Sequence, residues 1–317
     1  MQDFPDPFVL RVDDATTCGG QAPCYYAYAT ESGLFGLLDV PVARSTALAT
    51  WNWAGPDRTG GPAGTPDGKP DRNAMPVLAP WVEFGGNWAP SVLARPSNPA
   101  DEQYVMYYTA KSKDSSGYRG DECIGIATAG SPDGPFVDRS TAPVLCQVSA
   151  GGTIDASPFV ASDGSVYLTY SDDVGIRVQR LTSNALALAG GEQLLMRFDA
   201  GYPWELPRVE GPTMLSTPAT GIVLFYSAGT FDNSKYSVGA ARCDTPLGPC
   251  RNIYSTPTLS SRGGMFGPGG QTPFQLPDGS WRVAFHAWDN VVGYGAGGNR
   301  SLHILPLSFP GGNPAIG

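Results

Sequence analysis

Residues 155–181 read DASPFVASDGSVYLTYSDDVGIRVQRL and contain three short segments separated by Asp and Gly. The first segment is built around Pro158, the second is VYLTY at 166–170, and the third is GIRVQRL at 175–181. Short runs of β-branched and aromatic residues, bounded by turn-forming residues, are typical of β-strands. The stretch therefore predicts three consecutive strands joined by turns.

The same order of segments occurs five times along the chain. Each repeat begins around a proline and continues with an aromatic run and a third strand; these prolines are Pro7, Pro90, Pro158, Pro212 and Pro273. The aromatic runs are CYYAYAT, QYVMYYTAKS, SVYLTYSDD, GIVLFYSAGT and WRVAFHAWD. A unit of about 50–60 residues is marginal as an independent fold, whereas blades packed in a ring bury each other's faces. The repeats predict an all-β fold, a five-bladed β-propeller, as one domain over residues 1–317.

The composition agrees with many short strands and excludes several classes of partner. The 317 residues include 41 Gly and 30 Pro, and no stretch shows sustained helical periodicity. A formal net charge of −9 leaves no basic surface for phosphates or anionic lipids, so we expect no nucleic-acid and no membrane partner. No apolar run reaches the roughly 18 residues of a spanning helix. We expect a neutral substrate and a monomeric protein.

Six cysteines lie in three close pairs along the sequence. We expect each to bond to its neighbour, which gives the disulfides Cys18–Cys24, Cys123–Cys146 and Cys243–Cys250. Such bridges imply an oxidising compartment and hence a secreted protein. Six unpaired thiols in a cytosolic protein are the alternative, and zinc is a weaker one, because the chain has no CxxC pair and no histidine-rich spacing.

Acidic residues stand at or near the anchor proline in three of the five repeats. These positions hold Asp6, Ala89, Asp155, Glu210 and Gln271. The first strand of each blade lines the central channel of a propeller, so residues at these positions are expected to converge. Turn formation is the ordinary explanation for one such acid, but three acids beside apolar strands are costly without a purpose. Hydrolysis of a glycosidic bond needs one protonated and one ionised carboxyl group, and a third can raise the pKa of the acid.

Several motifs, taken in order, resemble glycoside hydrolase family 43. They are DFPDPFVL (3–10), VPVARSTALATW (40–51), NWAPSVL (87–93), GTIDASPFV (152–160), VEGPTML (209–215), FGPGGQTPF (266–274) and FHAW (285–288). That family contains five-bladed propellers that act as α-L-arabinofuranosidases, arabinanases and β-xylosidases. The resemblance implies that Asp6 is the general base, Glu210 the general acid, and Asp155 the residue that tunes and orients the acid. It also implies a single displacement with inversion.

Four further residues are candidates for substrate binding. Trp88 would offer an aromatic face to a sugar ring, or would be a core residue between blades. Arg300 resembles a family arginine that contacts substrate, with a surface arginine as the alternative. His286 either reaches the centre or has a structural role. Gln271 stands where the family often has a histidine that helps to hold a calcium ion, so a structural calcium at the propeller centre is doubtful; we expect no metal ligands and no required cofactor.

The leading functional hypothesis is an exo-acting α-L-arabinofuranosidase on arabinan or arabinoxylan, with an oligo- or polysaccharide as partner. Endo-arabinanase, β-xylosidase and exo-galactanase are alternatives within the resemblance, because they share the three acids and differ in loops. A noncatalytic carbohydrate-binding propeller is the alternative of another class, since a fold does not dictate function.

Overall fold

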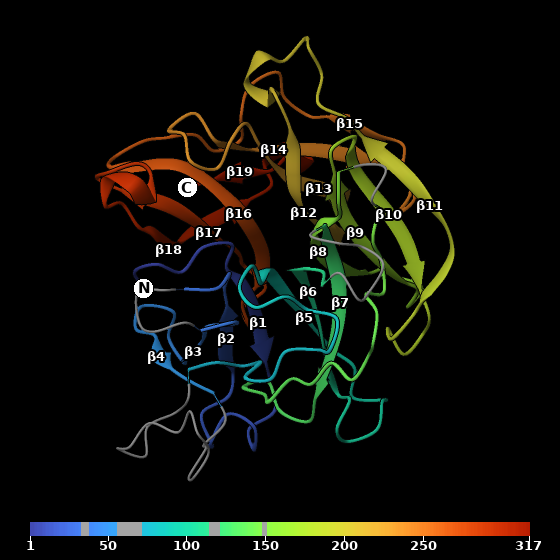
Figure 1. The fold of residues 1–317 in the computed structure, drawn as a ribbon. Coiled ribbons are helices and arrows are strands. Elements are labelled where there is room, and N and C mark those ends of the chain that lie inside the picture. The colour runs from blue at the N-terminus through green and yellow to red at the C-terminus, as the bar shows by residue number, and fades with distance from the viewer. Residues whose placement is uncertain (33–37, 56–71, 114–120, 148–150) are drawn as a thin grey trace.

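The computed structural model describes residues 1–32, 38–55, 72–113, 121–147 and 151–317. Within them the chain forms five antiparallel sheets of consecutive strands, which surround a common centre (Figure 1). Apart from the strands, these ranges hold short 3-10 turns at Pro203–Glu205, Tyr294–Ala296 and Pro310–Gly312. None of their helices is long and apolar enough to cross a membrane.

The five sheets are the blades of a propeller, numbered in chain order. Blade 1 contains β1 (Phe8–Val12), β2 (Cys24–Tyr28), β3 (Val42–Ser45) and β4 (Asn52–Trp53), and blade 2 contains β5 (Trp88–Ala94), β6 (Tyr104–Lys111) and β7 (Glu122–Ala129). Blade 3 contains β8 (Ile154–Val160), β9 (Val166–Asp172), β10 (Gly175–Leu181) and β11 (Leu188–Met196). Blade 4 contains β12 (Val209–Thr217), β13 (Gly221–Ala228), β14 (Ser237–Cys243) and β15 (Cys250–Asn252). Blade 5 contains β16 (Met265–Gln275), β17 (Trp281–Asp289), β18 (Arg300–Ser308) and β19 (Ala315–Ile316).

The first strand of each blade lies at the centre, and these inner strands close a ring. β1 contacts β5, β5 contacts β8, β8 contacts β12, β12 contacts β16, and β16 returns to β1. The N-terminal segment strengthens the joint between blades 5 and 1, because the Phe4 N–H donates to the Arg300 carbonyl at 2.7 Å and the Leu302 N–H donates to the Met1 carbonyl at 3.0 Å. The predicted five-bladed propeller is confirmed.

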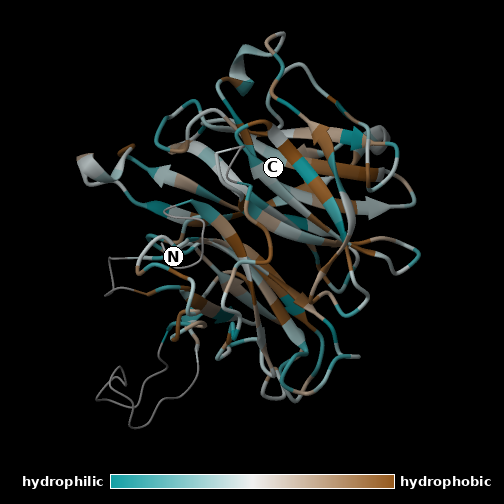
Figure 2. Cartoon of the chain, turned by 45° about the vertical axis from the view of Figure 1, so that its right-hand side comes forward, coloured by the Kyte–Doolittle hydropathy of each residue, from teal (hydrophilic) through white to brown (hydrophobic). Residues whose placement is uncertain are grey.

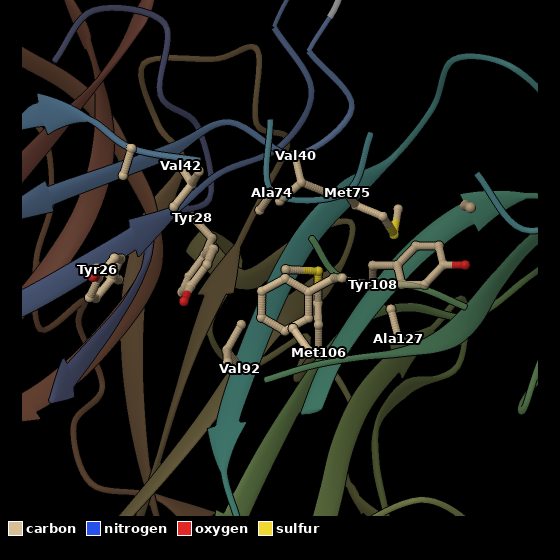
Figure 3. Close-up of a cluster of buried hydrophobic side chains, with 14 of the residues drawn as sticks. Tyr26, Tyr28, Val40, Val42, Ala74, Met75, Val92, Met106, Tyr108 and Ala127 are labelled. Atoms are coloured by element: carbon tan, nitrogen blue, oxygen red, sulfur yellow. The ribbon is translucent and has the colours of Figure 1, made fainter. Parts of the chain in front are cut away.

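The hydrophobic core is divided among the five interfaces between neighbouring blades. Side chains alternate between the two faces of a strand, so on β6 the side chains of Met106 and Tyr108 face blade 1, where they join the cluster of Tyr26 and Tyr28 (Figure 3). Val105 and Tyr107, which alternate with them along the strand, face blade 3. Both faces of a middle strand are therefore buried, and apolar residues follow the strands while polar residues gather in the loops (Figure 2). This explains why the aromatic runs of the sequence are apolar almost throughout.

All three predicted disulfides are confirmed. Cys18–Cys24 joins the segment before β2 to the first residue of that strand, Cys123–Cys146 joins β7 to the segment after it, and Cys243–Cys250 joins β14 to β15. The Cα–Cα distances are 5.6, 4.6 and 4.0 Å. The first and third bridges each close a short loop within one blade.

Candidate active site

The inner strands share a backbone irregularity at the same point of every blade. Five equivalent residues have positive φ angles: Asp6 (50°), Ala89 (43°), Asp155 (59°), Gly211 (59°) and Gly270 (58°). Four of them lie where the pairing register shifts in β5, β8, β12 and β16, and Asp6 lies just before β1. A bulge of this kind redirects a side chain. Three of the five residues are not glycine, and such conformations persist where the surroundings enforce them, often at functional sites.

This geometry revises the alignment based on the prolines. Asp6 and Asp155 are equivalent, but the residues equivalent to them in blades 4 and 5 are Gly211 and Gly270. Glu210 lies one residue before its bulge. A Cβ atom on Gly270 would lie 2.7 Å from Asp6 Oδ1, so only glycine leaves room for the carboxylate there.

Side chains of the preceding blade support most of the bulges. The Ala89 N–H donates to Thr30 Oγ1 at 2.9 Å, and the Asp155 N–H donates to Thr109 Oγ1 at 3.0 Å. The Gly270 N–H donates to Ser227 Oγ at 2.9 Å, and the Asp6 N–H to His286 Nδ1 at 3.0 Å. The Gly211 N–H instead donates to Asp155 Oδ2 at 3.0 Å. The bulge N–H of blade 4 therefore fixes one carboxylate of the site.

A cavity of about 1080 Å³ lies over the centre of the ring. Each blade contributes one of the predicted site residues to its lining: Asp6, Trp88, Asp155, Glu210 and Arg300, in blade order. The structure thus brings together five of the seven predicted residues. Trp88 belongs to the cavity wall rather than to the core, and the Lys111 ammonium lies 5.7 Å from the centre of its ring.

Asp6 lies in a strongly cationic and hydrogen-bonded environment. Thr30 Oγ1 donates to Asp6 Oδ2 at 2.7 Å, and Arg300 Nη1 lies 3.5 Å from the same oxygen. Burial opposes ionisation of Asp6, but the charge of Arg300 and the bonds to His286 and Thr30 outweigh it and hold the pKa of Asp6 well below its usual range. These surroundings therefore favour the ionised form of Asp6.

Asp155 and Glu210 have the opposite tendency. Burial raises the pKa of Asp155 first, and the nearby charges of Glu210 and Asp6 raise it further. Burial also raises the pKa of Glu210, although Tyr236 and Arg208 partly oppose this. Tyr236 Oη donates to Glu210 Oε1 at 2.6 Å, and Arg208 Nη1 lies 3.5 Å from Glu210 Oε2. The cavity therefore combines one carboxyl group whose surroundings favour ionisation with two whose burial favours the protonated form.

His286 and Gln271 are buried outside the lining of this cavity. His286 has no exposed surface; its Nδ1 atom accepts the Asp6 N–H and its ring stacks on that of Tyr236 at 6.0 Å. Gln271 lines a small central channel below the cavity, where its Nε2 donates to the Gly211 carbonyl at 2.6 Å and its Oε1 accepts from Ser227 at 2.8 Å. Both were candidates for substrate binding, with a structural role as the alternative for His286; in the structure, His286 Nδ1 and the amide group of Gln271 form hydrogen bonds between blades.

The channel does not fit a calcium ion. Calcium takes six to eight oxygen ligands, whereas the amide oxygen of Gln271 already accepts the Ser227 hydroxyl. Across the described ranges, no three His, Cys, Asp or Glu side chains are grouped so that they could hold a metal ion. No catalytic step is assigned to a metal here.

The structure adds site residues that the sequence did not indicate. Tyr236 and Arg208 contact Glu210, and Thr30 links the Asp6 carboxylate to the Ala89 bulge. The cavity is also more acidic than the motifs suggest, since eight carboxyl side chains and two arginines line it; the acids outside the predicted three are Asp3, Glu31, Glu122, Asp172 and Asp173. The last three belong to acidic pairs that look like ordinary solvent-exposed loop residues in the sequence.

Comparison with known proteins agrees with this geometry. The model of the glycosyl hydrolases family 43 matches residues 1–314. The chain is 24% identical over 281 residues to the arabinan endo-1,5-alpha-L-arabinosidase A of Aspergillus niger, covering 77% of this chain and 82% of that protein. Among solved structures, a thermostable family-43 glycoside hydrolase has a TM-score of 0.75 at 24% identity, covering 100% of this chain and 93% of that one. An endo-1,4-beta-xylanase of Bacteroides thetaiotaomicron has a TM-score of 0.74 at 25% identity, covering 100% and 94%. The chain therefore belongs to glycosyl hydrolase family 43.

Proposed function

We propose that this protein hydrolyses α-L-arabinofuranosidic bonds of arabinan, with Asp6 as general base and Glu210 as general acid. One observation carries the assignment of the base: in a single cavity, the pKa of Asp6 is held low while the pKa values of Asp155 and Glu210 are raised. The choice of Glu210 over Asp155 as the acid follows the family resemblance of the motif VEGPTML. Carboxyl groups whose pKa values are pushed apart by their surroundings are the expected acid and base of such an enzyme.

The reaction follows from these protonation states. Ionised Asp6 takes a proton from a water molecule, and the oxygen of that water bonds to the anomeric carbon. Glu210 gives its proton to the glycosidic oxygen as the bond to the leaving sugar breaks. The water attacks on the face opposite the leaving group, so one displacement inverts the anomeric carbon, as is characteristic of the family.

Asp155 acts on the acid rather than on the sugar in this scheme. Its Oδ2 atom accepts the Gly211 N–H at 3.0 Å, next to Glu210 in the chain, so its charge lies beside the acid. In the state in which Glu210 carries the proton and Asp155 is ionised, this charge favours the protonated form of Glu210. Asp155 is therefore proposed as a positioning residue that raises the pKa of the acid.

The substrate class rests on the lining of the cavity and on the relatives. Eight carboxyl groups against two arginines disfavour an acidic glycan. The sequence favoured an exo-acting α-L-arabinofuranosidase, and the similarity to an endo-acting arabinan hydrolase makes internal cleavage a second candidate. Xylan is a further candidate because of the similarity to a xylanase. Three disulfides support secretion, since such bonds persist in oxidising compartments.

The test is a product analysis on debranched arabinan, arabinoxylan, xylan and galactan. We expect cleavage of debranched arabinan above the others. Arabinose alone from the first minutes means exo action, and a ladder of oligosaccharides means endo action. Proton NMR of the fresh product should show the inverted anomer. Cleavage of xylan or galactan alone would refute the arabinan assignment, and binding without turnover on all four would refute catalysis.

A further inference from the structure

Two large aromatic side chains are exposed at the rim of the cavity, between blades 4 and 5. Phe231 is 45% exposed and Tyr294 is 46% exposed, and both line the cavity. Phe231 follows β13 and Tyr294 lies in the connection between β17 and β18. The sequence motifs indicated neither residue. Aromatic rings left open to solvent beside a polar cavity commonly mark a binding surface.

Arg300 and Trp288 hold both rings in place. The guanidinium carbon of Arg300 lies 4.9 Å from the centre of the Phe231 ring and 5.6 Å from that of Tyr294, and Arg300 Nε donates to Tyr294 Oη at 3.1 Å. Trp288 Nε1 donates to the Phe231 carbonyl at 2.8 Å, and its ring meets the edge of Tyr294 at 4.9 Å. Rings fixed in this way bind a ligand without much loss of conformational entropy.

The aromatic pair lies higher in the cavity than the catalytic groups. Glu210 is 7% exposed and the Asp6 side chain is 21% exposed, against nearly half for each ring. The ring attacked by water must lie at the floor beside Asp6. The rim is therefore left for another ring of the same glycan.

We infer that Phe231 and Tyr294 form a subsite for the sugar ring adjacent to the one being cleaved, in a neutral glycan. The apolar C–H face of that ring packs on the aromatic faces, which supply contact area and exclude water. An acidic sugar is disfavoured there by the carboxyl groups that line the cavity. This inference rests on the proposed function, because it assumes that the floor of the cavity holds the cleaved ring.

Chain length of the substrate provides the test. The variants are Phe231→Ala and Phe231→Tyr, with Phe198→Ala as the matched control, because Phe198 is 38% exposed after β11 and outside the cavity lining. The substrates are 1,5-α-L-arabinotriose and α-L-arabinofuranosyl fluoride, which lacks a second ring. We expect Phe231→Ala to raise KM for arabinotriose about tenfold, with a several-fold smaller effect on the fluoride. Phe231→Tyr should restore KM, and Phe198→Ala should match the wild type.

Equal losses on both substrates, or no loss on arabinotriose, would overturn the subsite. Binding separates this result from a failure of the proposed function. Arabinotriose and xylotriose are titrated calorimetrically into Glu210→Gln with and without Phe231→Ala, where no turnover is needed. A Kd about tenfold weaker without the ring, for either sugar, supports the subsite even if the wild type cleaves no arabinan. An unchanged Kd for both sugars overturns it.

Discussion

The two sides of the cavity treat a carboxyl group in opposite ways. On the side of blades 5 and 1, Asp6 receives hydrogen bonds from Thr30 and lies beside the charge of Arg300, which keeps it ionised. On the side of blades 3 and 4, burial raises the pKa values of both Asp155 and Glu210, and the charge of Glu210 raises that of Asp155 further. The same propeller thus supplies a base and an acid because the carboxyl groups of different blades have different neighbours. The comparison teaches that the neighbours of the bulge, more than the bulge itself, define the chemistry.

Removing the base on the Asp6 side of the cavity should cause the largest loss of activity. Asp6→Asn keeps the shape of the side chain but cannot accept a proton from water. We expect kcat to fall by about 10⁴-fold, because general-base catalysis contributes on this scale. Initial rates on debranched arabinan, with circular dichroism as the check on folding, measure it. A loss of less than about tenfold would remove Asp6 from the role of base.

Removing the acid should depend on the leaving group. Glu210→Ala is expected to lower kcat/KM on arabinan by about 10³-fold, but by a much smaller factor on aryl arabinofuranosides whose leaving group needs little protonation. The ratio of the two losses is the quantity to measure. Equal losses on the two substrates would show that Glu210 does not donate the proton.

Removing the cation from the Asp6 side should raise the pKa of Asp6 towards the pKa values of the carboxyl groups on the other side. Arg300→Met takes away the charge that lowers the pKa of Asp6. Because the base must be ionised, activity is lost as the pH falls through that pKa, so the acidic limb of kcat/KM should move to higher pH. The expected loss at neutral pH is about tenfold to a hundredfold. An unchanged acidic limb in a full pH profile would contradict the assigned electrostatic role.

Removing the hydrogen bond to Glu210 should shift the alkaline limb of the pH profile, by less than the acidic limb shifts in Arg300→Met. Tyr236→Phe removes the hydrogen bond that lowers the pKa of Glu210. The acid then stays protonated to higher pH, so the alkaline limb should move up while kcat at neutral pH changes only a few-fold, on the scale of one hydrogen bond. The same profile records it, and a downward shift of that limb would refute the assignment.

A change outside the cavity should lower the stability of the protein without changing the pKa values of the carboxyl groups on either side. The double variant Cys243→Ser and Cys250→Ser opens the bridge between β14 and β15, and neither cysteine lines the cavity. We expect a stability loss of roughly 2–4 kcal/mol in denaturant unfolding. Both limbs of the pH profile should stay in place. A displaced limb would show that the edge of blade 4 influences Glu210.

The fold was predictable because each blade is encoded by residue types that are close together in the sequence. Aromatic runs, turn residues and anchor prolines recur in each blade, and the disulfides join close neighbours in the sequence. The three acids were found for the same reason. His286 and Gln271 could not be placed, because their roles depend on contacts across blades, with Asp6 and Gly211. Phe231, Tyr236 and Tyr294 carry no motif, since only the folded ring brings them to the cavity. The positive φ angles at Gly211 and Gly270 correspond to glycines in the sequence, at the end of the EG and GG pairs within the inner strands.

The bulge of blade 2 holds Ala89, which has a φ angle of 43° and no functional group, with its N–H bonded to Thr30. This position is equivalent to those of Asp6 and Asp155 in blades 1 and 3, but its side chain has no reactive group. The side chain at this position therefore differs between blades while the backbone bulge is the same. Because the backbone already has the positive φ angle found at Asp6 and Asp155, one substitution at this position would place a reactive group at an equivalent point of the inner strands.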